Sequence, residues 1–447
     1  MKNEDLSPGS PPCVACGHVH FASVERIVIG DDATDRLGEY LDAKALRRVL
    51  VVDDANTAEV AGDGLAVVLR AAGHTVTRHH FSERSGLLAD ASALDAVRGR
   101  LRADASDVAI AVGSGVINDL TRYATFLEQR PYISFPTAAS MDGYAANVAA
   151  MQFDGLKITF VAHAPRAIFA DPAVLATAPA AMTIWGIGDL LGKATAHFDW
   201  RLSKGLLGED FCPLVERVVA RPMQKVAHIV SALRQDDPFA LAELIDGLIL
   251  SGTAMSMFGN SRPASGCEHH ASHFWDLLAF RGMRAHHPHG LQVGYATRFA
   301  LRLQKAALAR IEQFAPPFVL VVEPSSDESA WLGPDNPTLK EVRSEKAHML
   351  EATHLRTSKD EAPMTEVRAL VGEAAGAFDE IDAALEDAGF PLSARFADVD
   401  EAALRATFLY ANRLRSRYSV LSLLESQGAL VEIVDEVLKV ASTGNDA

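Results

Sequence analysis

The N-terminal third of the chain alternates short apolar runs, rich in β-branched residues, with longer stretches whose apolar residues recur at helical spacing. Short apolar runs bounded by turn residues are typical of buried strands, and the stretches between them are typical of the helices that cover a parallel sheet. The strands that we expect span residues 47–54, 74–81, 107–115 and 132–137, and a later strand-like piece spans 157–171. This pattern predicts an α/β domain.

The pattern changes at about Met182. Beyond this point apolar residues recur at helical spacing, and no convincing series of strands follows. We therefore expect a mobile leader at residues 1–20, an α/β domain at 21–178 and an all-α domain at 179–447.

Composition narrows the class of protein. The chain has 447 residues, of which 49% are apolar, so that it has ample material for large cores. Its net charge of −16 disfavours nucleic acid as a partner, because phosphate backbones require clustered lysines and arginines. Four cysteines, a start without the apolar stretch of a signal peptide and the lack of a long uninterrupted apolar run favour a reduced cytoplasmic enzyme without membrane insertion.

A glycine-rich turn follows one of the expected strands. In AVGSGVINDLTRYAT the strand runs into Gly113, Ser114 and Gly115 and then into an expected helix, where backbone N–H groups could hold a phosphate. Asn118 stands where a GxGxxG motif has its third glycine, and such turns are equally common without a ligand. From the residues alone, nucleotide binding and a plain turn both remain open.

Two further expected strands end in polar residues. Asp53 and Asp54 end one of them, where a carboxylate can accept hydrogen bonds from a ribose or cap a helix. The loop SFPTAASMDGYAA, which carries Asp142, follows another strand at the edge of the sheet where ligands bind in open α/β folds. A helix cap and a plain loop are the alternatives.

The start of the helical region contains a carboxylate among apolar residues. In WGIGDLLGKATAHFDW, Asp189 and Lys193 are four residues apart and would share one face of a helix, where a surface ion pair is one alternative. The apolar neighbours argue against full exposure, and burial of a carboxylate is costly unless it is paired or bound to a metal.

Histidines are concentrated in one segment. If CEHHASHFWDLLAF is helical, His269 and His273 project from one face, and His289 lies at a turn between Pro288 and Gly290 that begins another helix. Six of the sixteen histidines fall in this segment: His269, His270, His273, His286, His287 and His289. Two imidazoles and the carboxylate of Asp189 suit a catalytic divalent metal, so we favour a metal site over a structural histidine pair.

The leader contains a second group of metal-binding residue types. Cys13 and Cys16 are followed by His18 and His20, so the segment could hold zinc or act as a redox pair. Because all four residues fall within a leader that we expect to be mobile, we favour neither role.

Four motifs in order, GSGVINDLTRY, PTAASMDGYA, GIGDLLGK and SRPASGCEHHASHFW, resemble those of the sn-glycerol-1-phosphate dehydrogenases. This family belongs to the superfamily of dehydroquinate synthase, glycerol dehydrogenase and the iron-containing alcohol dehydrogenases. The resemblance extends from about Val49 to RLRSRYSVLSLLESQGAL near the C-terminus. It implies a dehydroquinate synthase-like fold, with a dinucleotide-binding α/β domain at 21–178 and a helical metal-binding and catalytic domain at 179–447.

The resemblance also implies roles for individual residues. Asp189, His269 and His289 take the positions of the metal ligands, and His273 takes that of a histidine near the nicotinamide and substrate. Lys193 stands where the iron-containing alcohol dehydrogenases have a further histidine ligand, and it could instead meet a substrate phosphate. The remaining matches are Gly113, Ser114, Gly115 and Asp119 at the pyrophosphate turn, Thr137 and Ser140 in a second cofactor loop, and Asp142 for substrate hydroxyls. Cys267, where we expect a small residue, and the cysteines of the leader depart from the pattern.

The implied activity is an NAD(P)-dependent, metal-dependent oxidoreductase that interconverts dihydroxyacetone phosphate and sn-glycerol 1-phosphate in phospholipid biosynthesis. The metal would be zinc, nickel or iron, and His273 would donate the proton. Lys193 and Arg262 would bind the phosphate, and an acidic Asp53 favours NAD over NADP. We expect the subunits to associate into a homo-oligomer.

Three other functions remain consistent with the sequence. A glycerol or polyol dehydrogenase would need no phosphate-binding cations. A dehydroquinate synthase-like lyase would consume no net NADH. A nucleotide-binding protein without catalytic activity would have no need of an open metal site.

Overall fold

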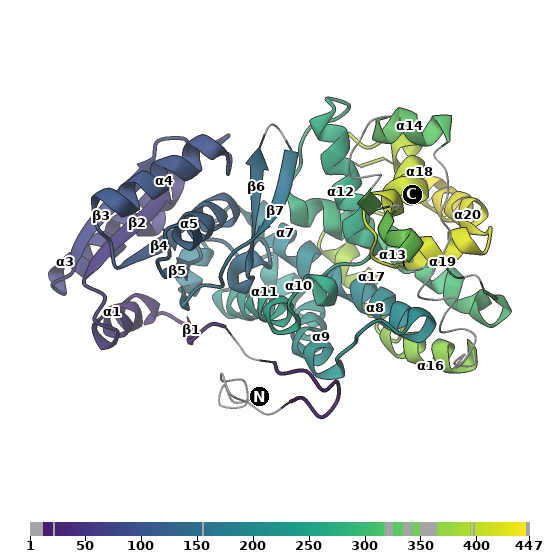
Figure 1. Cartoon of the computed structure of the whole chain (residues 1–447), viewed down its shortest axis with the longest axis horizontal. Coiled ribbons are helices and arrows are strands. Elements are labelled where there is room, and N and C mark those ends of the chain that lie inside the picture. Colours follow the sequence, from purple (N-terminus) through teal and green to yellow (C-terminus); the bar gives the residue numbers. More distant parts are fainter. Residues whose placement is uncertain are drawn as a thin grey trace. The chain divides into compact units, whose positions relative to one another are not determined.

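The computed structural model describes residues 12–20, 23–153, 156–316, 318, 325–333, 341–342, 344–348, 364–393, 395–396 and 398–443 (Figure 1). Residues 1–11 of the expected leader lie outside this part of the chain. The chain divides into a sheet unit, Met1–Leu190 with Arg217–Ser261, and a helical unit, Leu191–Glu216 with Arg262–Ala447. Residues 217–261, which we expected in the helical domain, are thus part of the sheet unit.

A six-stranded parallel sheet forms the centre of the sheet unit, in the order β1-β8-β5-β4-β2-β3. Its strands are β1 (Arg26–Ile29), β2 (Arg48–Asp54), β3 (Thr75–Phe81), β4 (Val108–Val112), β5 (Tyr132–Phe135) and β8 (Ala167–Ala170). The expected strands at 47–54, 74–81, 107–115 and 132–137 are confirmed as β2 to β5. Every residue of β4 and β5 is buried, which explains why these strands are continuously apolar in the sequence.

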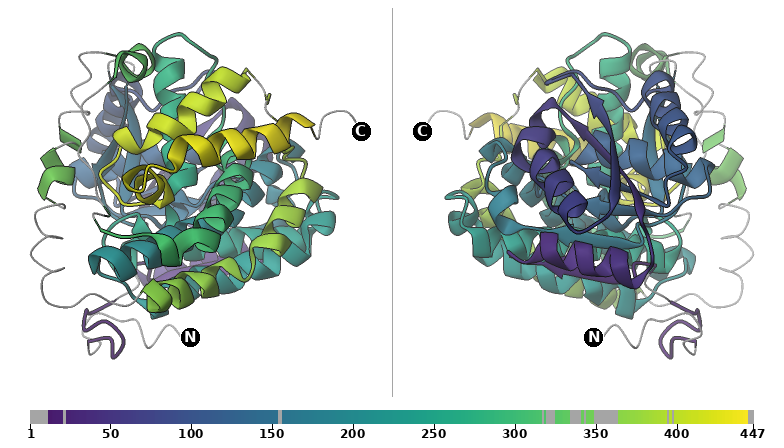
Figure 2. Two further views of the ribbon diagram at one scale, coloured as in Figure 1. Left: turned by 90° about the vertical axis from the view of Figure 1, so that its right-hand side faces the viewer. Right: turned by 90° about the vertical axis from the view of Figure 1, so that its left-hand side faces the viewer.

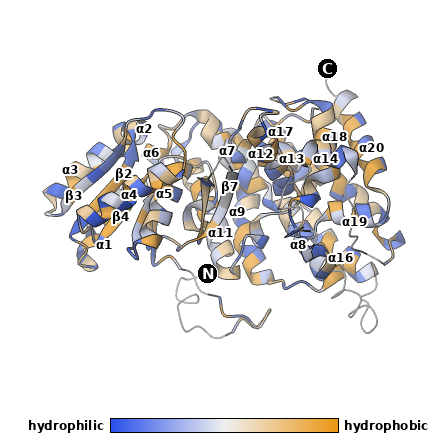
Figure 3. Ribbon diagram, turned by 45° about the horizontal axis from the view of Figure 1, so that its top comes forward, coloured by the Kyte–Doolittle hydropathy of each residue, from blue (hydrophilic) through white to orange (hydrophobic). Residues whose placement is uncertain are grey.

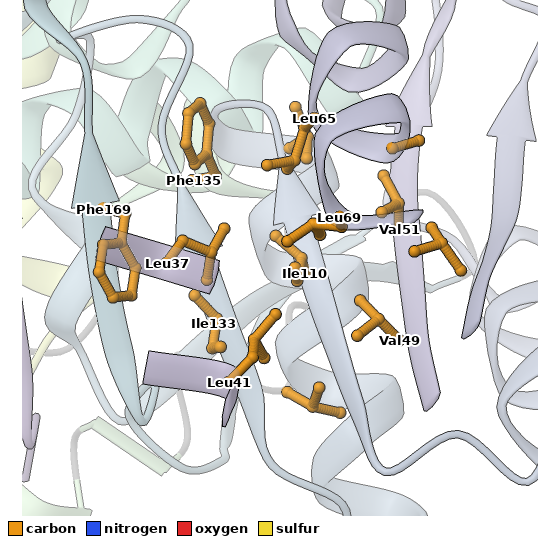
Figure 4. Packing of buried hydrophobic residues seen from close by; sticks show 14 of the residues in the cluster. Leu37, Leu41, Val49, Val51, Leu65, Leu69, Ile110, Ile133, Phe135 and Phe169 are labelled. Atoms are coloured by element: carbon orange, nitrogen blue, oxygen red, sulfur yellow. The ribbon is translucent and has the colours of Figure 1, made fainter. Parts of the chain in front are cut away.

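Helices cover both faces of this sheet. On one face, Leu37 and Leu41 of α1 (Ala33–Ala43) and Leu65 and Leu69 of α3 (Asp63–Ala71) pack against alternate strand residues such as Ile110 (Figure 4). On the other face, helices α4 (Ala91–Ala103) and α5 (Gly115–Leu127) cover the intervening strand residues. The predicted α/β architecture is therefore confirmed.

Four strands, β1, β6, β7 and β8, were not predicted as the structure has them. The expected piece 157–171 is two strands, β7 (Leu156–Val161) and β8, and β7 pairs with β6 (Val148–Phe153) in an antiparallel hairpin outside the main sheet. The strand β1 was missed because its apolar run, residues 27–29, is only three residues long.

The remaining helices that lie wholly or largely in the sheet unit follow β2, β5, β8 or one another along the chain. They are α2 (Ala55–Thr57), the π-helix Ala58–Gly62, the 3-10 turn Gly143–Ala145, α6 (Pro172–Leu175), α7 (Ala180–Leu191), α9 (Pro213–His228), α10 (Val230–Leu233) and α11 (Pro238–Phe258).

Helix α11 begins where its sequence predicts a helix start. The side chain of Asp237 accepts a hydrogen bond from the N–H of Ala240, and Pro238 occupies the first turn. Among the described helices it alone is long and apolar enough to cross a membrane, and 67% of its most apolar window is buried inside the structure, as in core helices of globular proteins.

In the helical unit, the described residues form helices and short 3-10 turns joined by loops, with one isolated bridge between Phe396 and Val399. The helices are α8 (Lys193–Leu207), α12 (Cys267–Phe280), α13 (His289–Arg310), α14 (Ser326–Leu332), α16 (Met364–Ala375), α17 (Phe378–Asp387), α18 (Glu401–Tyr410), α19 (Val420–Ser426) and α20 (Leu430–Thr443). The 3-10 turns are Arg262–Ala264, Ile311–Gln313 and Ala411–Arg413. The expected change to an all-α region is confirmed.

Helix α13 is the central element of this unit, because it packs against α8, α12, α16, α17, α19 and α20. The C-terminal helices α18 and α20 pack on each other (yellow-green and yellow in Figure 2). Hydrophobic and hydrophilic residues alternate around α20 (Figure 3), and its buried residues, among them Ile433, Val434 and Val437, recur at helical spacing.

Candidate functional site

The glycine-rich turn lies at the point in the sheet where the strand order reverses. Strand β2 is flanked by β3 and β4, so the turn Gly113–Gly115 after β4 and Asp53 at the end of β2 lie at the carboxyl ends of neighbouring strands. Ligands of open α/β sheets bind at this position. A Cβ atom on Gly113 would lie 2.7 Å from Cβ of Ile117, so the close approach of turn and helix requires glycine.

Asn118, at the place of the missing third glycine, has a structural contact. Its Oδ1 accepts a hydrogen bond from the buried Ser134 hydroxyl at 3.1 Å, which joins α5 to β5. Asp119, on the next position, pairs with Arg122 at 2.9 Å and accepts a hydrogen bond from the N–H of Ala150. Arg122 in turn donates to the carbonyl of Val148, so this pair holds the start of the β6–β7 hairpin.

Asp53 is fully buried, and protein groups contact both of its oxygens. Arg78 donates to Oδ2 at 2.5 and 3.1 Å, and Nδ1 of His80 lies 2.8 Å from Oδ1. A role in holding a ribose therefore stays a prediction. Asp54 is the N-cap of α2, with its side chain accepting from Asn56 and Thr57, which confirms the helix-cap alternative for this residue.

The loop after β5 carries three more expected site residues. Thr137 and Ser140 are buried, and Asp142 accepts a hydrogen bond from Ser251 of α11 at 2.9 Å. The N–H of Asp142 donates to Oδ2 of Asp189 at 3.0 Å, so the buried carboxylate of α7 holds the end of this loop.

Asp189 of α7 lies in the sheet unit, whose first segment ends at the next residue, Leu190. His269 and His289 belong to the helical unit. Helix α7 ends at Leu191 and α8 begins at Lys193, so the expected single helix through both charged residues is interrupted at Gly192. Lys193 is fully buried.

The two expected histidine ligands of the helical unit are close together. His269 follows the start of α12, which spans the predicted stretch CEHHASHFWDLLAF, and His289 is the first residue of α13. Their rings lie 5.0 Å apart between centroids. Nδ1 of His269 lies 2.7 Å from Oε1 of Glu268, and Nδ1 of His289 lies 3.2 Å from Oγ of Ser272. These contacts leave Nε2 of each ring as the atom suited to bind a metal.

Glu268, which holds His269, is itself fixed by three donors. Its Oε1 also accepts a hydrogen bond from the N–H of Gly266 at 2.7 Å, and its Oε2 accepts one from the Thr195 hydroxyl at 2.6 Å. Burial raises the pKa of Glu268, while the hydrogen bonds from Thr195 and Gly266 oppose this shift. The carboxylate is thus a fixed acceptor behind the histidine.

A second buried carboxylate, Asp199 of α8, connects three segments of the helical unit. Its oxygens accept hydrogen bonds from the N–H groups of Cys267 and Val420 and from Nε2 of Gln304. Burial, with the neighbouring charge of Glu268, raises the pKa of Asp199 to about 7. Burial also raises the pKa of the Cys267 thiol well above its usual value, which disfavours the reactive thiolate.

His273, the third histidine with an expected role, contacts Arg415. Nη2 of Arg415 donates a hydrogen bond to Nε2 of His273 at 2.8 Å, and Nδ1 of His273 lies 4.0 Å from Oδ2 of Asp276. The pKa of Arg415 is lowered by burial, and that of Arg417 is lowered to about 9 by burial and by the charges of Arg262 and Arg415.

We define Arg262, Arg415 and Arg417 as the arginine cluster. The buried His270 lies within reach of its charges, because burial and all three arginines lower the pKa of His270. Arg262 donates to the carboxylate of Glu209 and to the carbonyls of Asp199 and Tyr418, so its guanidinium joins the segments that carry the cluster.

Several of these residues were not predicted from the sequence. Glu268 and Ser272 lie beside expected ligands in α12, and hydrogen-bonding side chains next to a metal-binding histidine are a usable signal. Arg415 lies 142 residues from His273, and nothing in the local pattern of RLRSRY indicates that pairing.

The chain is similar in sequence to known proteins. The sequence profile of the iron-containing alcohol dehydrogenases matches residues 28–179. A protein of Halalkalibacterium halodurans named glycerol-1-phosphate dehydrogenase (NAD(P)+) is 40% identical over 306 residues, which cover 67% of this chain and 76% of the relative. A protein of Bacillus licheniformis with the same name is 30% identical over 423 residues, which cover 93% and 92% of the two chains.

Solved structures show the same fold. An NADH-dependent butanol dehydrogenase of Thermotoga maritima aligns with a TM-score of 0.60 at 16% identity, over 96% of this chain and 99% of that one. A glycerol dehydrogenase of Schizosaccharomyces pombe aligns with a TM-score of 0.58 at 17% identity, over 95% and 92%. The predicted fold class, a dinucleotide-binding-type α/β region followed by a helical region, is confirmed.

Proposed function

The chain belongs to the glycerol-1-phosphate dehydrogenase family, and from this premise we propose that it catalyses reversible hydride transfer between NAD(P)H and dihydroxyacetone phosphate, giving sn-glycerol 1-phosphate. The observation that carries the proposal is the pair His269 and His289, whose Nδ1 atoms both have hydrogen-bond partners and whose Nε2 atoms suit a metal. Relatives that bear the name of this activity supply the substrate.

Asp189, His269 and His289 are the proposed ligands of one divalent metal. One carboxylate and two imidazoles suit zinc, iron or nickel and leave positions open for substrate. Support comes from the chemistry of the donors: each histidine is oriented by a neighbouring side chain, and Asp189 is a buried carboxylate whose negative charge a bound cation would offset.

When bound, the metal supplies Lewis acidity and the nicotinamide supplies the hydride. His273 is the proposed proton donor for the substrate oxygen. Because Nε2 of His273 accepts a hydrogen bond from Arg415, the proton of the neutral ring lies on Nδ1, and this atom would deliver it. Arg415 would keep the ring oriented during this step.

The phosphate of the substrate would be held by cations of the helical unit. Lys193 and Arg262 are candidates from the sequence, and the structure adds Arg415 and Arg417. A bound phosphate would offset the repulsion within the arginine cluster, and guanidinium groups bind phosphate oxygens in pairs. Since Arg262 already forms an ion pair with Glu209, we assign the larger share of phosphate binding to Arg415 and Arg417. This binding would position the ketone for reaction.

The cofactor would lie at the carboxyl ends of β2, β4 and β5. The proposed contacts are Gly113, Ser114, Gly115 and Asp119 for the pyrophosphate, Thr137 and Ser140 for the second loop, and Asp53 for the ribose side. Asp142 is proposed to bind substrate hydroxyls. Because Asp53 already binds Arg78 and His80, we propose NAD(P)(H) without a preference for either form.

The test is oxidation of NADH and NADPH by metal-loaded protein with dihydroxyacetone phosphate, compared with unphosphorylated dihydroxyacetone. We expect rapid oxidation with the phosphorylated ketone alone, and its loss in the His269→Ala variant. Equal rates with both ketones would support a polyol dehydrogenase. Binding of NAD(P) and metal without reduction of either ketone would contradict the proposal and favour a lyase that recycles its cofactor.

Cytoplasmic location, association into a homo-oligomer, zinc, iron or nickel as the native metal and a place in lipid biosynthesis remain part of this proposal. Sedimentation analysis of the purified chain, metal analysis and fractionation of the source cells test these parts separately.

A further inference from the structure

The segment 13–20 forms a tight turn that brings its cysteines and one histidine together. The N–H of Gly17 donates to the carbonyl of Cys13 at 2.7 Å, and the N–H of Cys13 donates to the carbonyl of His18 at 2.8 Å. Gly17, directly after the second cysteine, has a φ of 77°, a left-handed conformation that favours glycine. One ligand atom each of Cys13, Cys16 and His20 lies within 4.8 Å of the others.

A hydrogen bond at Nδ1 of His20 leaves Nε2 as the nitrogen that could bind a metal. Its ring is buried, and its Nδ1 lies 2.9 Å from the carbonyl of Met257 in α11. Because a carbonyl only accepts, Nδ1 must carry the proton. Nε2 then carries the lone pair, and it lies 3.1 Å from Sγ of Cys16. Metal-binding histidines are usually oriented by such a hydrogen bond from the second ring nitrogen to a backbone carbonyl.

We propose that Cys13, Cys16 and His20 bind a structural zinc ion. The spacing of the two cysteines is that of many zinc sites, and two thiolates with an imidazole select zinc over harder divalent cations. Binding would release the two thiol protons, including the one that Cys16 shares with His20, and a further side chain or a water would complete four-coordination.

The ion would fix the segment to the sheet unit. His20 is joined to Met257 near the end of α11, so a metal that links His20 to Cys13 and Cys16 ties residues 13–20 to that helix. This site has no substrate-facing role, and the inference stands apart from the proposed reductase activity.

The experiment uses the full-length chain with the substitutions His269→Ala and His289→Ala, which remove the proposed catalytic ligands. After expression with zinc and extensive dialysis under reducing conditions, we expect about one zinc ion per chain by mass spectrometry. Adding Cys13→Ser and Cys16→Ser, or His20→Gln, should remove it. His18→Gln is the matched control, because His18 lies in the same turn but contributes its carbonyl to the turn, and it should retain zinc.

X-ray absorption at the zinc edge of the wild-type chain gives a second readout that does not depend on variants that could fail to fold. A sulfur shell at about 2.3 Å is expected, with at least two sulfurs per zinc if only this site holds zinc and at least one on average if the catalytic site, whose proposed ligands contain no sulfur, holds zinc as well. Absence of zinc from the double-alanine chain, a zinc shell without sulfur, or a Cys13–Cys16 disulfide in place of metal would overturn the proposal. None of these outcomes bears on whether the ketone is reduced.

Discussion

Arg415 donates a hydrogen bond to Nε2 of His273 at 2.8 Å and thereby joins the proposed proton donor to the arginine cluster. The two residues are 142 positions apart in the sequence and belong to the same helical unit. One side chain would therefore both orient the imidazole and attract the phosphate, so that binding of the phosphorylated end and proton delivery depend on the same group.

Replacement of Arg415 tests this relationship. We expect Arg415→Ala to lower kcat/KM for dihydroxyacetone phosphate by about 10- to 100-fold, because a hydrogen bond to a charged group contributes roughly 1.5–3 kcal/mol. KM should rise as phosphate binding weakens, and kcat should fall as His273 loses its orientation. Arg310→Ala on α13, whose side chain is 34% exposed, is the control and should change neither value. An unchanged KM would contradict the phosphate role.

Glu268 should control metal affinity through His269. In Glu268→Gln the side chain keeps its size but loses the charge that accepts from Nδ1 of His269, and such changes commonly weaken metal binding about 10- to 100-fold. Competition with a chelator measures the affinity directly. The exposed Glu386→Gln on α17 is the matched control. If Glu268→Gln held the metal as tightly as the original chain, the assignment of His269 as a ligand would be in doubt.

Local sequence patterns were sufficient to predict those helices and strands that depend on the apolar pattern of a single stretch. The stretch CEHHASHFWDLLAF, which the sequence analysis took as helical, is α12, and the buried strands β4 and β5 followed from their continuous apolar runs. The clustering of histidines also indicated the pair His269 and His289, which the structure holds 5.0 Å apart.

Such patterns could not predict contacts between segments that are distant in the sequence. The position of Asp53 near the end of β2 left a ribose ligand and a helix cap open, and it could not indicate the partners that the register supplies, His80 of β3 and Arg78, both of which bind its carboxylate. The spacing of Asp189 and Lys193 left a surface ion pair as one alternative, and this alternative is wrong because Lys193 is fully buried. Such pairings depend on strand register and helix packing, which no single stretch of sequence specifies.

His163 should make the stability of the sheet unit depend on pH. Burial and the charge of Arg122 lower its pKa from 6.5 to about 4, and its ring stacks on Tyr132 and contacts the Thr125 hydroxyl. The unfolded chain therefore binds this proton more readily than the folded one between these values. The stabilisation is complete above about pH 6.5 and is lost as the pH falls towards 4.

The substitution His163→Phe keeps a ring on Tyr132 but removes the titrating group. We expect the loss in free energy of unfolding between neutral and mildly acidic pH to be smaller in this variant than in the original chain, as measured by chemical unfolding at each pH. His228→Gln on the exposed part of α9 is the control and should keep the original pH dependence. Equal slopes in the original chain and His163→Phe would show that His163 is not responsible.

Gly186 of α7 should tolerate no side chain. A Cβ atom at this position would lie 1.9 Å from the carbonyl oxygen of Ala139, a backbone atom of the loop that leads to Asp142. Helix and loop would have to move apart, and this motion would stretch the hydrogen bond from the N–H of Asp142 to Asp189. We expect Gly186→Ala to lower the free energy of unfolding by roughly 1–3 kcal/mol or more and to reduce ketone reduction.

Gly64→Ala in α3 is the matched comparison. This glycine is also helical, but nothing lies within 4 Å of an added Cβ, so helix propensity alone should stabilise the variant by roughly 0.5–1 kcal/mol. Thermal unfolding of the two variants should therefore shift in opposite directions. If Gly186→Ala were as stable as the original chain and fully active, the close approach of α7 to the loop would not be needed to hold Asp189 in its working position.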